Sequence, residues 1–184
     1  MSSFDRALIL NGSPRENGVT TRLIARAEAQ LKQAGCGKIT RFDCYENATA
    51  PCIACGDCER QLSCRFHDLD ALYAALQEAD LLLIASPVYN LGFPAPLKAV
   101  IDRLQPFYCA RCMRREPLPP PKKGIALLCC GGDGGGVKAY FEEPLRQLGT
   151  VINTRFSDIL IAPSMDAGCD LEDIFITLDQ ILGG

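Results

Sequence analysis

The sequence predicts an α/β protein in which one parallel β-sheet is covered by helices on both faces. Short apolar segments alternate with longer segments in which apolar residues recur at helical spacing. Leu81–Ala85 is a continuous apolar run, which is typical of a strand buried on both faces of a parallel sheet. Strands that alternate with helices are joined by right-handed crossovers. Because the chain has 184 residues, 48% of them hydrophobic, we expect residues 1–184 to form a single domain.

Five apolar segments have the length and composition of strands. We expect them at Arg6–Leu10, Lys38–Phe42, Leu81–Ala85, Ile125–Cys130 and Val151–Ile161, the last with an interruption near Ser157. The proline-rich residues 117–121 form an extended connector before the fourth strand.

Five segments have the spacing of amphipathic helices. Gly35 stops the first helix, Asp68 is the expected N-cap of the second, and Pro96 lies near the start of the third. The residues expected to face the core are Leu23, Ile24, Ala27 and Leu31 in about Thr20–Ala34; Leu69, Leu72 and Leu76; Leu97, Val100, Ile101 and Leu104; Phe141, Leu145 and Leu148; and Leu171, Ile174, Phe175, Leu178 and Leu182 in about Leu171–Leu182.

Three strands end in loops rich in Gly, Pro and hydroxyl residues, at residues 11–21, 86–93 and 131–136. Ligands of parallel sheets bind outside the carboxyl ends of the strands. The first loop runs from a strand into a helix, so the unpaired N–H groups of that helix can hold a phosphate. It matches neither the P-loop nor the dinucleotide pattern, and a polar turn without a ligand is the alternative.

The other two loops have features that suit a flavin ring. Ser86–Asn90 turns sharply at a strand end and carries an aromatic side chain, while the glycines of 131–136 let a second backbone segment approach closely. The alternative is that both are ordinary turns.

Eleven cysteines are many for a chain of this length. Cys52, Cys55, Cys58 and Cys64 form C-x2-C-x2-C-x5-C within a loop insertion at about residues 50–66, and a loop with this spacing can wrap an iron–sulfur cubane. Free or disulfide-linked thiols and a zinc site are the alternatives. Since only Ile53 and Leu62 are large apolar side chains between Cys52 and Cys64, we expect a bound cluster to be the main source of order in the loop.

The remaining cysteines fall into two groups. The pair Cys109 and Cys112 fits a zinc site, a redox disulfide or a plain dithiol. The others lie in or beside apolar runs and are expected to be inert core residues: Cys36, Cys44, Cys129, Cys130 and Cys169.

Composition argues against several functional classes. A net charge of −3 gives no support for nucleic-acid binding, and the longest apolar run is too short to span a membrane. No signal peptide is visible, so we expect a cytoplasmic protein. The single histidine, His67, excludes most histidine-dependent catalysis. Five basic residues flank the proline connector, which suits an NADPH phosphate, an acidic electron-transfer partner or a solvated surface: Arg111, Arg114, Arg115, Lys122 and Lys123.

Three segments together carry a resemblance that covers about residues 5–150. They are Gly12-Ser13-Pro14-Arg15 with Gly18-Val19-Thr20; Ser86-Pro87-Val88-Tyr89; and Leu97-Lys98 with Ile101-Asp102-Arg103. In these the chain resembles the flavodoxin-like NAD(P)H-dependent FMN reductase superfamily, and in its cysteine loop the iron–sulfur flavoprotein branch. The resemblance implies a flavodoxin-like three-layer sandwich with a five-stranded parallel sheet in the order 2-1-3-4-5.

The resemblance also implies the roles of individual residues. Ser13, Arg15, Gly18, Val19 and Thr20 would surround the phosphate of FMN, although the family usually has Asn where this chain has Val19. The flavin ring would lie against Pro87, Val88, Tyr89, Asn90, Gly131, Gly132, Asp133 and Gly134.

The function implied is an FMN-dependent oxidoreductase in which no side chain need act as a catalytic acid or base. Electrons would pass from NAD(P)H or a ferredoxin-type donor to a small acceptor (a quinone, a flavin or an oxygen species), and a [4Fe–4S] cluster is the expected second cofactor. A non-enzymatic electron carrier is the alternative, and a zinc-stabilised binding module is a third. Resemblance alone suggests a homodimer or homotetramer.

Overall fold

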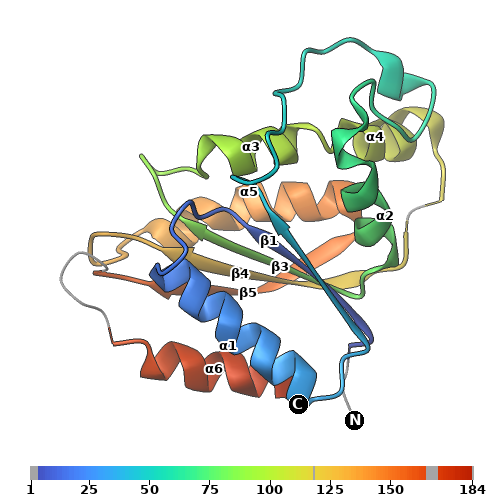
Figure 1. Ribbon diagram of the computed structural model, residues 1–184. Coiled ribbons are helices and arrows are strands. Elements are labelled where there is room, and N and C mark those ends of the chain that lie inside the picture. The colour runs from blue at the N-terminus through green and yellow to red at the C-terminus, as the bar shows by residue number, and fades with distance from the viewer. Residues whose placement is uncertain (1–3, 118, 165–169, 184) are drawn as a thin grey trace.

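The computed structural model describes residues 4–117, 119–164 and 170–183. Its centre is a five-stranded sheet in the order β2-β1-β3-β4-β5, and every neighbouring pair of strands is parallel (Figure 1). The strands are β1 (Arg6–Asn11), β2 (Lys38–Asp43), β3 (Leu81–Pro87), β4 (Lys122–Cys129) and β5 (Thr154–Ala162). The predicted fold class and strand order are therefore confirmed.

Helices cover both faces of this sheet (Figure 1). α1 (Val19–Gln33) and α6 (Glu172–Gly183) pack on one face, where their apolar residues form a core with Ile9, Leu83 and Ile125. On the other face lie α2 (Asp70–Glu78), α3 (Ala95–Asp102), α4 (Gln105–Tyr108) and α5 (Val137–Ile152). The shorter turns are η1 (Asp57–Glu59), η2 (His67–Leu69) and η3 (Cys109–Arg114), the last wound as a π-helix.

The fifth strand begins later than the sequence pattern predicts. Val151 and Ile152 belong to α5, not to β5. Asn153 ends the helix in a left-handed conformation with φ of 50°, and asparagine tolerates that conformation better than most residues. The predicted interruption at Ser157 is a bulge: Gly124 pairs with Phe156, Ile125 pairs with Asp158, and Ser157 has no partner across the ladder.

The prediction that Asp68 caps the second helix is wrong. Asp68 lies inside η2, which runs directly into α2, and Leu69 occupies the N-cap position. The carboxylate of Asp68 instead binds Arg103, the buried C-cap residue of α3, and no local sequence signal indicates this pair. Among the described residues, no helix combines the length and the hydrophobicity needed to cross a membrane.

Candidate functional site

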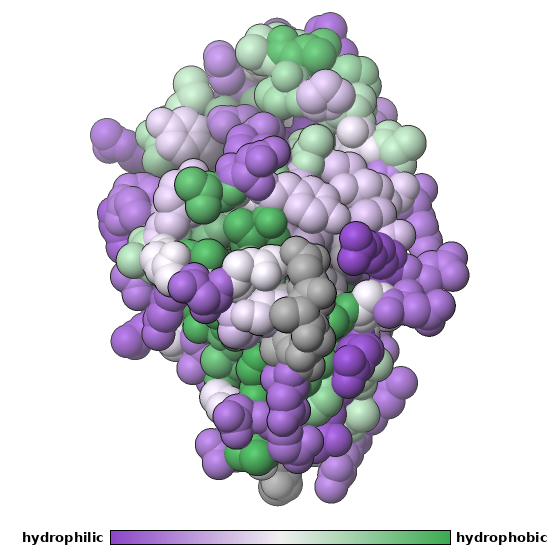
Figure 2. Space-filling view, turned by 90° about the vertical axis from the view of Figure 1, so that its left-hand side faces the viewer, coloured by the Kyte–Doolittle hydropathy of each residue, from purple (hydrophilic) through white to green (hydrophobic). Residues whose placement is uncertain are grey.

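A pocket of about 410 Å³ opens where β1, β3 and β4 end. Figure 2 looks onto this edge of the molecule and shows hydrophobic residues near its middle, bordered by polar ones. The lining brings together residues from all three predicted loops: Ser13, Arg15, Asn17, Gly18, Val19, Thr20, Pro87, Val88, Tyr89, Cys129, Cys130 and Gly131.

The first wall of the pocket is the loop between β1 and α1, and side chains hold its backbone in place. The amide of Ser13 donates to the side-chain oxygen of Asn11 at 3.0 Å, and the amide of Arg15 donates to the Ser13 hydroxyl at 3.2 Å. Asn11 is fixed in turn by a 2.6 Å hydrogen bond to Asp43 on β2. Side chains of the loop and of the neighbouring strand therefore shape its backbone.

Close packing beneath this loop requires a glycine. A Cβ atom on Gly12 would come within 2.8 Å of the Leu97 side chain and 2.9 Å of the Ser86 hydroxyl. The amide of Gly12 donates to the carbonyl of Ala85 at 2.8 Å, so the loop is joined directly to β3. The glycine at this position allows the loop after β1 to pack directly against β3 and α3.

The N-terminus of α1 points into the pocket. Gly18 is its N-cap residue, no side chain of the described residues caps it, and its first turn contains no acidic residue. The first N–H groups of a helix lack partners within the helix and carry a partial positive charge. Thr20, which is buried, adds a hydroxyl whose nearest partner is the sulfur of Cys129 at 3.4 Å. This end of the pocket is suited to an anion.

The second wall is a tight hairpin after β3. Tyr89 and Gly92 exchange two backbone hydrogen bonds of 3.0 and 2.9 Å, and Asn90 and Leu91 between them both have positive φ angles. Two such residues make the turn that suits the twist of a hairpin. The turn presents Tyr89, which is 44% exposed, beside the pocket, whereas Asn90 at its tip lies outside the lining.

The third wall is the glycine loop after β4. Gly131 lines the pocket, but Gly132, Asp133 and Gly134 do not. Asp133 accepts a hydrogen bond from the amide of Gly135 at 2.8 Å and so folds the loop onto itself. Its role among the described residues is to shape the turn that leads into α5.

Three residues of the lining were not predicted from the sequence. Cys129 and Cys130 were assigned to the core and are indeed buried, yet both also border the pocket, as does Asn17. For the two cysteines, the available signal was their position directly before Gly131 at the end of a strand, where ligands of parallel sheets bind. Cys44 is a core residue as predicted, and its burial raises the pKa of its thiol to about 12. Cys169 lies outside the described residues.

A second cavity, of about 440 Å³, gathers the predicted metal-binding cysteines. Cys52, Cys55, Cys58 and Cys64 all line it. A fifth cysteine, Cys109 of η3, lines it too, and its sulfur lies 3.8 Å from that of Cys58. Burial and this neighbouring thiol raise the pKa of Cys58 to about 11. Within the described residues no three Cys, His, Asp or Glu side chains converge closely enough to hold a single metal ion.

The cysteine loop has anchors of its own. The guanidinium of Arg103 donates to the carbonyls of Ala50 at 2.9 Å and Phe66 at 3.0 Å, which stand on either side of the loop. Arg114 donates to the carbonyl of Cys58 at 2.6 Å and holds its middle. Leu62 packs against the core, although Ile53 is 56% exposed. The sequence predicts a bound cluster as the main source of order in the loop and does not reveal the hydrogen bonds of Arg103 and Arg114.

Comparison with known proteins places the chain in a family. Residues 6–154 match the family described as NADPH-dependent FMN reductase. An "Iron-sulfur flavoprotein" from Methanosarcina thermophila is 34% identical over 128 residues, which are 69% of this chain and 63% of that protein. Another from Archaeoglobus fulgidus is 30% identical over 149 residues, which are 79% of this chain and 64% of that protein. The match thus spans less than two thirds of the length of these relatives.

A solved structure agrees on the fold. The NAD(P)H:quinone oxidoreductase from Methanothermobacter marburgensis superposes with a TM-score of 0.76 over 95% of both chains, at 18% sequence identity. The fold of β2-β1-β3-β4-β5, the three loops at its carboxyl edge and the match over residues 6–154 lead to one conclusion. The chain belongs to the NADPH-dependent FMN reductase family.

Proposed function

We propose that the protein is an FMN-dependent oxidoreductase that takes electrons from NAD(P)H or a ferredoxin-type donor and passes them to a small acceptor such as a quinone, a flavin or an oxygen species. One observation carries the proposal most directly: residues far apart in the sequence, which the family resemblance assigns to FMN, line a single pocket at the carboxyl edge of the sheet. Membership of the FMN reductase family supports the same function.

The phosphate of FMN would lie at the N-terminus of α1. Ser13 and Thr20 supply hydroxyls, and Val19 supplies a backbone N–H group at the start of the helix. Arg15 supplies a positive charge at the rim, and Gly18, whose own N–H donates to the carbonyl of Arg15 at 3.4 Å, borders the site. The uncapped helix end fits this group, because a capping side chain would occupy the same N–H donors. Val19 contributes no side-chain donor where the family usually has Asn.

The flavin ring would lie between the second and third walls. Pro87, Val88 and Tyr89 offer an apolar and aromatic surface, and Gly131 leaves its backbone accessible. The amide of Val88 is already bonded to the carbonyl of Cys129 at 2.8 Å, so the two walls are fixed relative to each other. Bound FMN supplies the redox chemistry, since its ring accepts a hydride and releases electrons singly or in pairs. The side chains bind and orient it and exclude water from its inner face.

We also propose that Cys52, Cys55, Cys58 and Cys64 hold a [4Fe–4S] cluster. Four thiols face one cavity, which suits a cubane whose irons each take a separate thiolate. A zinc ion needs its ligands around one point, and the described residues provide no such group. The names of the iron–sulfur flavoproteins from Methanosarcina and Archaeoglobus support the cluster.

The experiment that tests the enzymatic function is steady-state oxidation of NADH and NADPH by the FMN-loaded protein with an added quinone. Turnover well above that of free FMN supports the enzyme. Reduction only by a low-potential protein donor would instead favour an electron carrier, which the cysteine cavity also makes chemically reasonable. The oligomeric state, proposed as a dimer or tetramer, is measurable in the same preparation by light scattering.

A further inference from the structure

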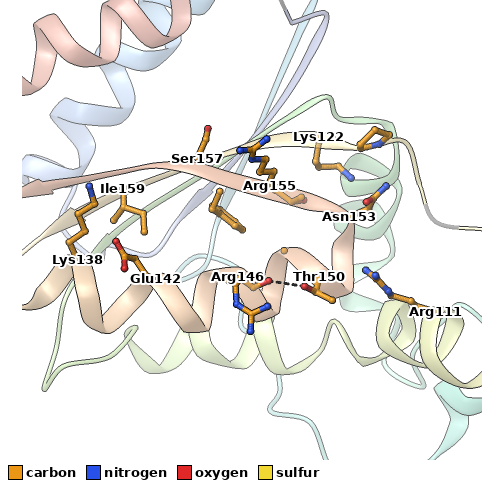
Figure 3. Close-up of a pocket in the computed structure, with 14 residues that line it drawn as sticks. Arg111, Lys122, Lys138, Glu142, Arg146, Thr150, Asn153, Arg155, Ser157 and Ile159 are labelled. Carbon is orange, nitrogen blue, oxygen red and sulfur yellow. Dashed lines mark hydrogen bonds between the residues drawn. The ribbon is translucent and has the colours of Figure 1, made fainter.

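A third cavity, of about 670 Å³, lies away from both sites described above (Figure 3). It runs along the groove between α5 and β5 and extends to Lys122 and Thr154, the first residues of β4 and β5. The amino ends of parallel strands share one edge of the sheet, so this end of the cavity is opposite the flavin pocket. Its volume falls in the range of roughly 300–1,000 Å³ that is usual for small-molecule sites.

The lining of this cavity is strongly basic in a chain whose net charge is −3. Only one carboxylate, that of Glu142, is part of it. Arg146 is neutralised by two hydrogen bonds of 2.7 and 2.6 Å to Glu143. The other basic residues form no ion pair with any carboxylate of the described residues: Arg111, Lys122, Lys138 and Arg155.

Lys122 is the most unusual of these cations because only 3% of it is exposed. Its ammonium group donates to two backbone carbonyls, that of Ile152 at 3.2 Å and that of Pro120 at 3.4 Å. A buried charge is costly unless an opposite charge compensates it. Burial accordingly lowers the pKa of Lys122 to about 8. An anion in the cavity would remove this cost.

Arg111 reaches the same end of the cavity from a different part of the chain. Figure 3 shows its guanidinium extending from η3 toward Thr150 and Asn153 at the end of α5. A guanidinium matches the geometry of phosphate oxygens with two parallel donors. The basic residues that flank the proline connector in the sequence thus separate in space: Arg111 and Lys122 line this cavity, while Arg114 pairs with Glu116 and Lys123 with Asp158.

The floor of the cavity is apolar. Phe156, Ile159 and Pro121 contribute to its lining. Gly149 on α5 faces the ring of Phe156 and has no side chain to cover it; a Cβ atom there would lie 3.4 Å from the ring. A cavity with an aromatic floor and a rim of several separated cations is complementary to an apolar body that carries more than one negative charge. Neither feature is explained by the flavin site.

We propose that this cavity binds a small phosphorylated molecule whose phosphate groups meet the basic rim and whose apolar or aromatic body lies on Phe156, the chemistry of a nucleoside diphosphate. ADP is the probe, added to the FMN-loaded protein at low ionic strength and followed by isothermal titration calorimetry. We expect ADP to bind at a single site per chain and adenosine, which lacks the phosphates, to show no saturable binding.

Charge-reversal variants place the binding in the cavity. Arg111→Glu and Lys138→Glu reverse the charge of two side chains of the lining that are not buried, and each is expected to weaken ADP binding by about tenfold or more. Lys32→Glu is the matched control, because it makes the same change of charge on an exposed residue of α1, on the other face of the sheet. It should alter the affinity less than about twofold. FMN content should be equal in all four proteins.

Three results would overturn the proposal. One is the absence of saturable ADP binding at low ionic strength, including the case in which only a long polyanion such as heparin binds. Another is adenosine binding as tightly as ADP. The third is unchanged ADP affinity in Arg111→Glu and Lys138→Glu, which would place the nucleotide elsewhere. None of these results bears on whether FMN occupies the pocket at the opposite edge, so the two proposals fail separately.

Discussion

The guanidinium of Arg103 lies 2.5 Å from the carboxylate of Asp68 and connects α3 to both ends of the cysteine loop. Arg103 is 1% exposed, and the ring of Phe66 lies 4.9 Å from its guanidinium carbon. Arg103 therefore holds in place the cavity that the four candidate cluster ligands line. Its partners are distant in sequence: Ala50 is 53 residues away and Asp68 is 35 residues away. The cysteine loop and the flavodoxin-like core are joined through this residue.

Breaking this pair should loosen the loop and lower stability. Asp68→Asn keeps the shape of the side chain but removes its charge, so we expect a loss of about 1–3 kcal/mol in the free energy of unfolding. Urea denaturation measures the loss, and limited proteolysis should show faster cleavage within residues 51–65. Asp70→Asn is the matched control: Asp70 pairs with His67 on the surface, where such pairs contribute less than about 1 kcal/mol. Equal stability of Asp68→Asn and wild type would contradict the anchoring role.

The same pair predicts a dependence on pH. Burial on its own would raise the pKa of Asp68, but the hydrogen bond and the charge of Arg103 outweigh it, and the pKa is lowered. A carboxyl with a lowered folded-state pKa contributes stability above its unfolded value, about 3.9, and loses it as the pH falls through the folded value. The stability difference between wild type and Asp68→Asn should therefore be full at pH 7 and shrink below about pH 4. A difference that stays constant down to pH 3 would contradict this account.

Gly12→Ala tests the packing under the first loop. Its Cβ would meet Leu97 and Ser86 at less than 3 Å, and neither can retreat without moving the buried core. We expect a loss of about 1–3 kcal/mol in stability and a lower content of bound FMN. Gly132→Ala is the control for stability, because a Cβ there has nothing within 4 Å. Thermal unfolding that is unchanged in Gly12→Ala would show that the loop is looser than described.

The cysteine cavity predicts what happens with and without metal. Protein purified without oxygen should carry about four iron atoms per chain and a broad absorbance near 400 nm. After metal is removed, oxygen or hydrogen peroxide should oxidise Cys58 and Cys109 to a disulfide by accepting their two electrons and two protons, since their sulfurs are 3.8 Å apart. Peptide mass spectrometry detects the cross-link.

Two variants check that result. Cys109→Ser should abolish the cross-link, whereas Cys112→Ser, which changes the exposed thiol three residues further along η3, should leave it intact. A stoichiometric zinc ion in the anaerobic protein, or an absence of any metal with FMN still bound, would refute the cluster and leave the flavin site untouched.

Local patterns in the sequence predict the strands and the three loops, whereas the strand order and the individual pocket residues come from the family resemblance. Leu81–Ala85 is buried on both faces, as its unbroken apolar run predicts, and Ser13, Thr20, Val88 and Gly131 meet because parallel strands end at a common edge. What the sequence does not show is contact between distant residues. Nothing local indicates that Cys109 stands beside Cys58, 51 residues earlier, or that Arg103 is buried under the cysteine loop.

Boundaries failed where two patterns overlap. Val151 and Ile152 are apolar and β-branched, which suits a strand, yet they complete the last turn of α5 because Asn153 supplies the left-handed residue that ends it. Asp68 has the sequence features of an N-cap, but its carboxylate binds the buried guanidinium of Arg103 and not the N–H groups of the helix. In both places a tertiary contact or a single backbone conformation overrides local preference.

FMN is expected to bind with its phosphate at the N-terminus of α1, and fluorescence titration of FMN measures whether it does. Ser13→Ala with Thr20→Ala removes two poorly exposed hydroxyls, and each buried donor lost should cost about 1–3 kcal/mol of binding. Thr177→Ala, which removes a hydroxyl from α6, should bind FMN like wild type. We expect wild type to quench the fluorescence of FMN, with an affinity that falls at least about thirtyfold in the double variant. Equal affinity of wild type and the double variant would contradict the placement, and no FMN binding by wild type would contradict the function itself.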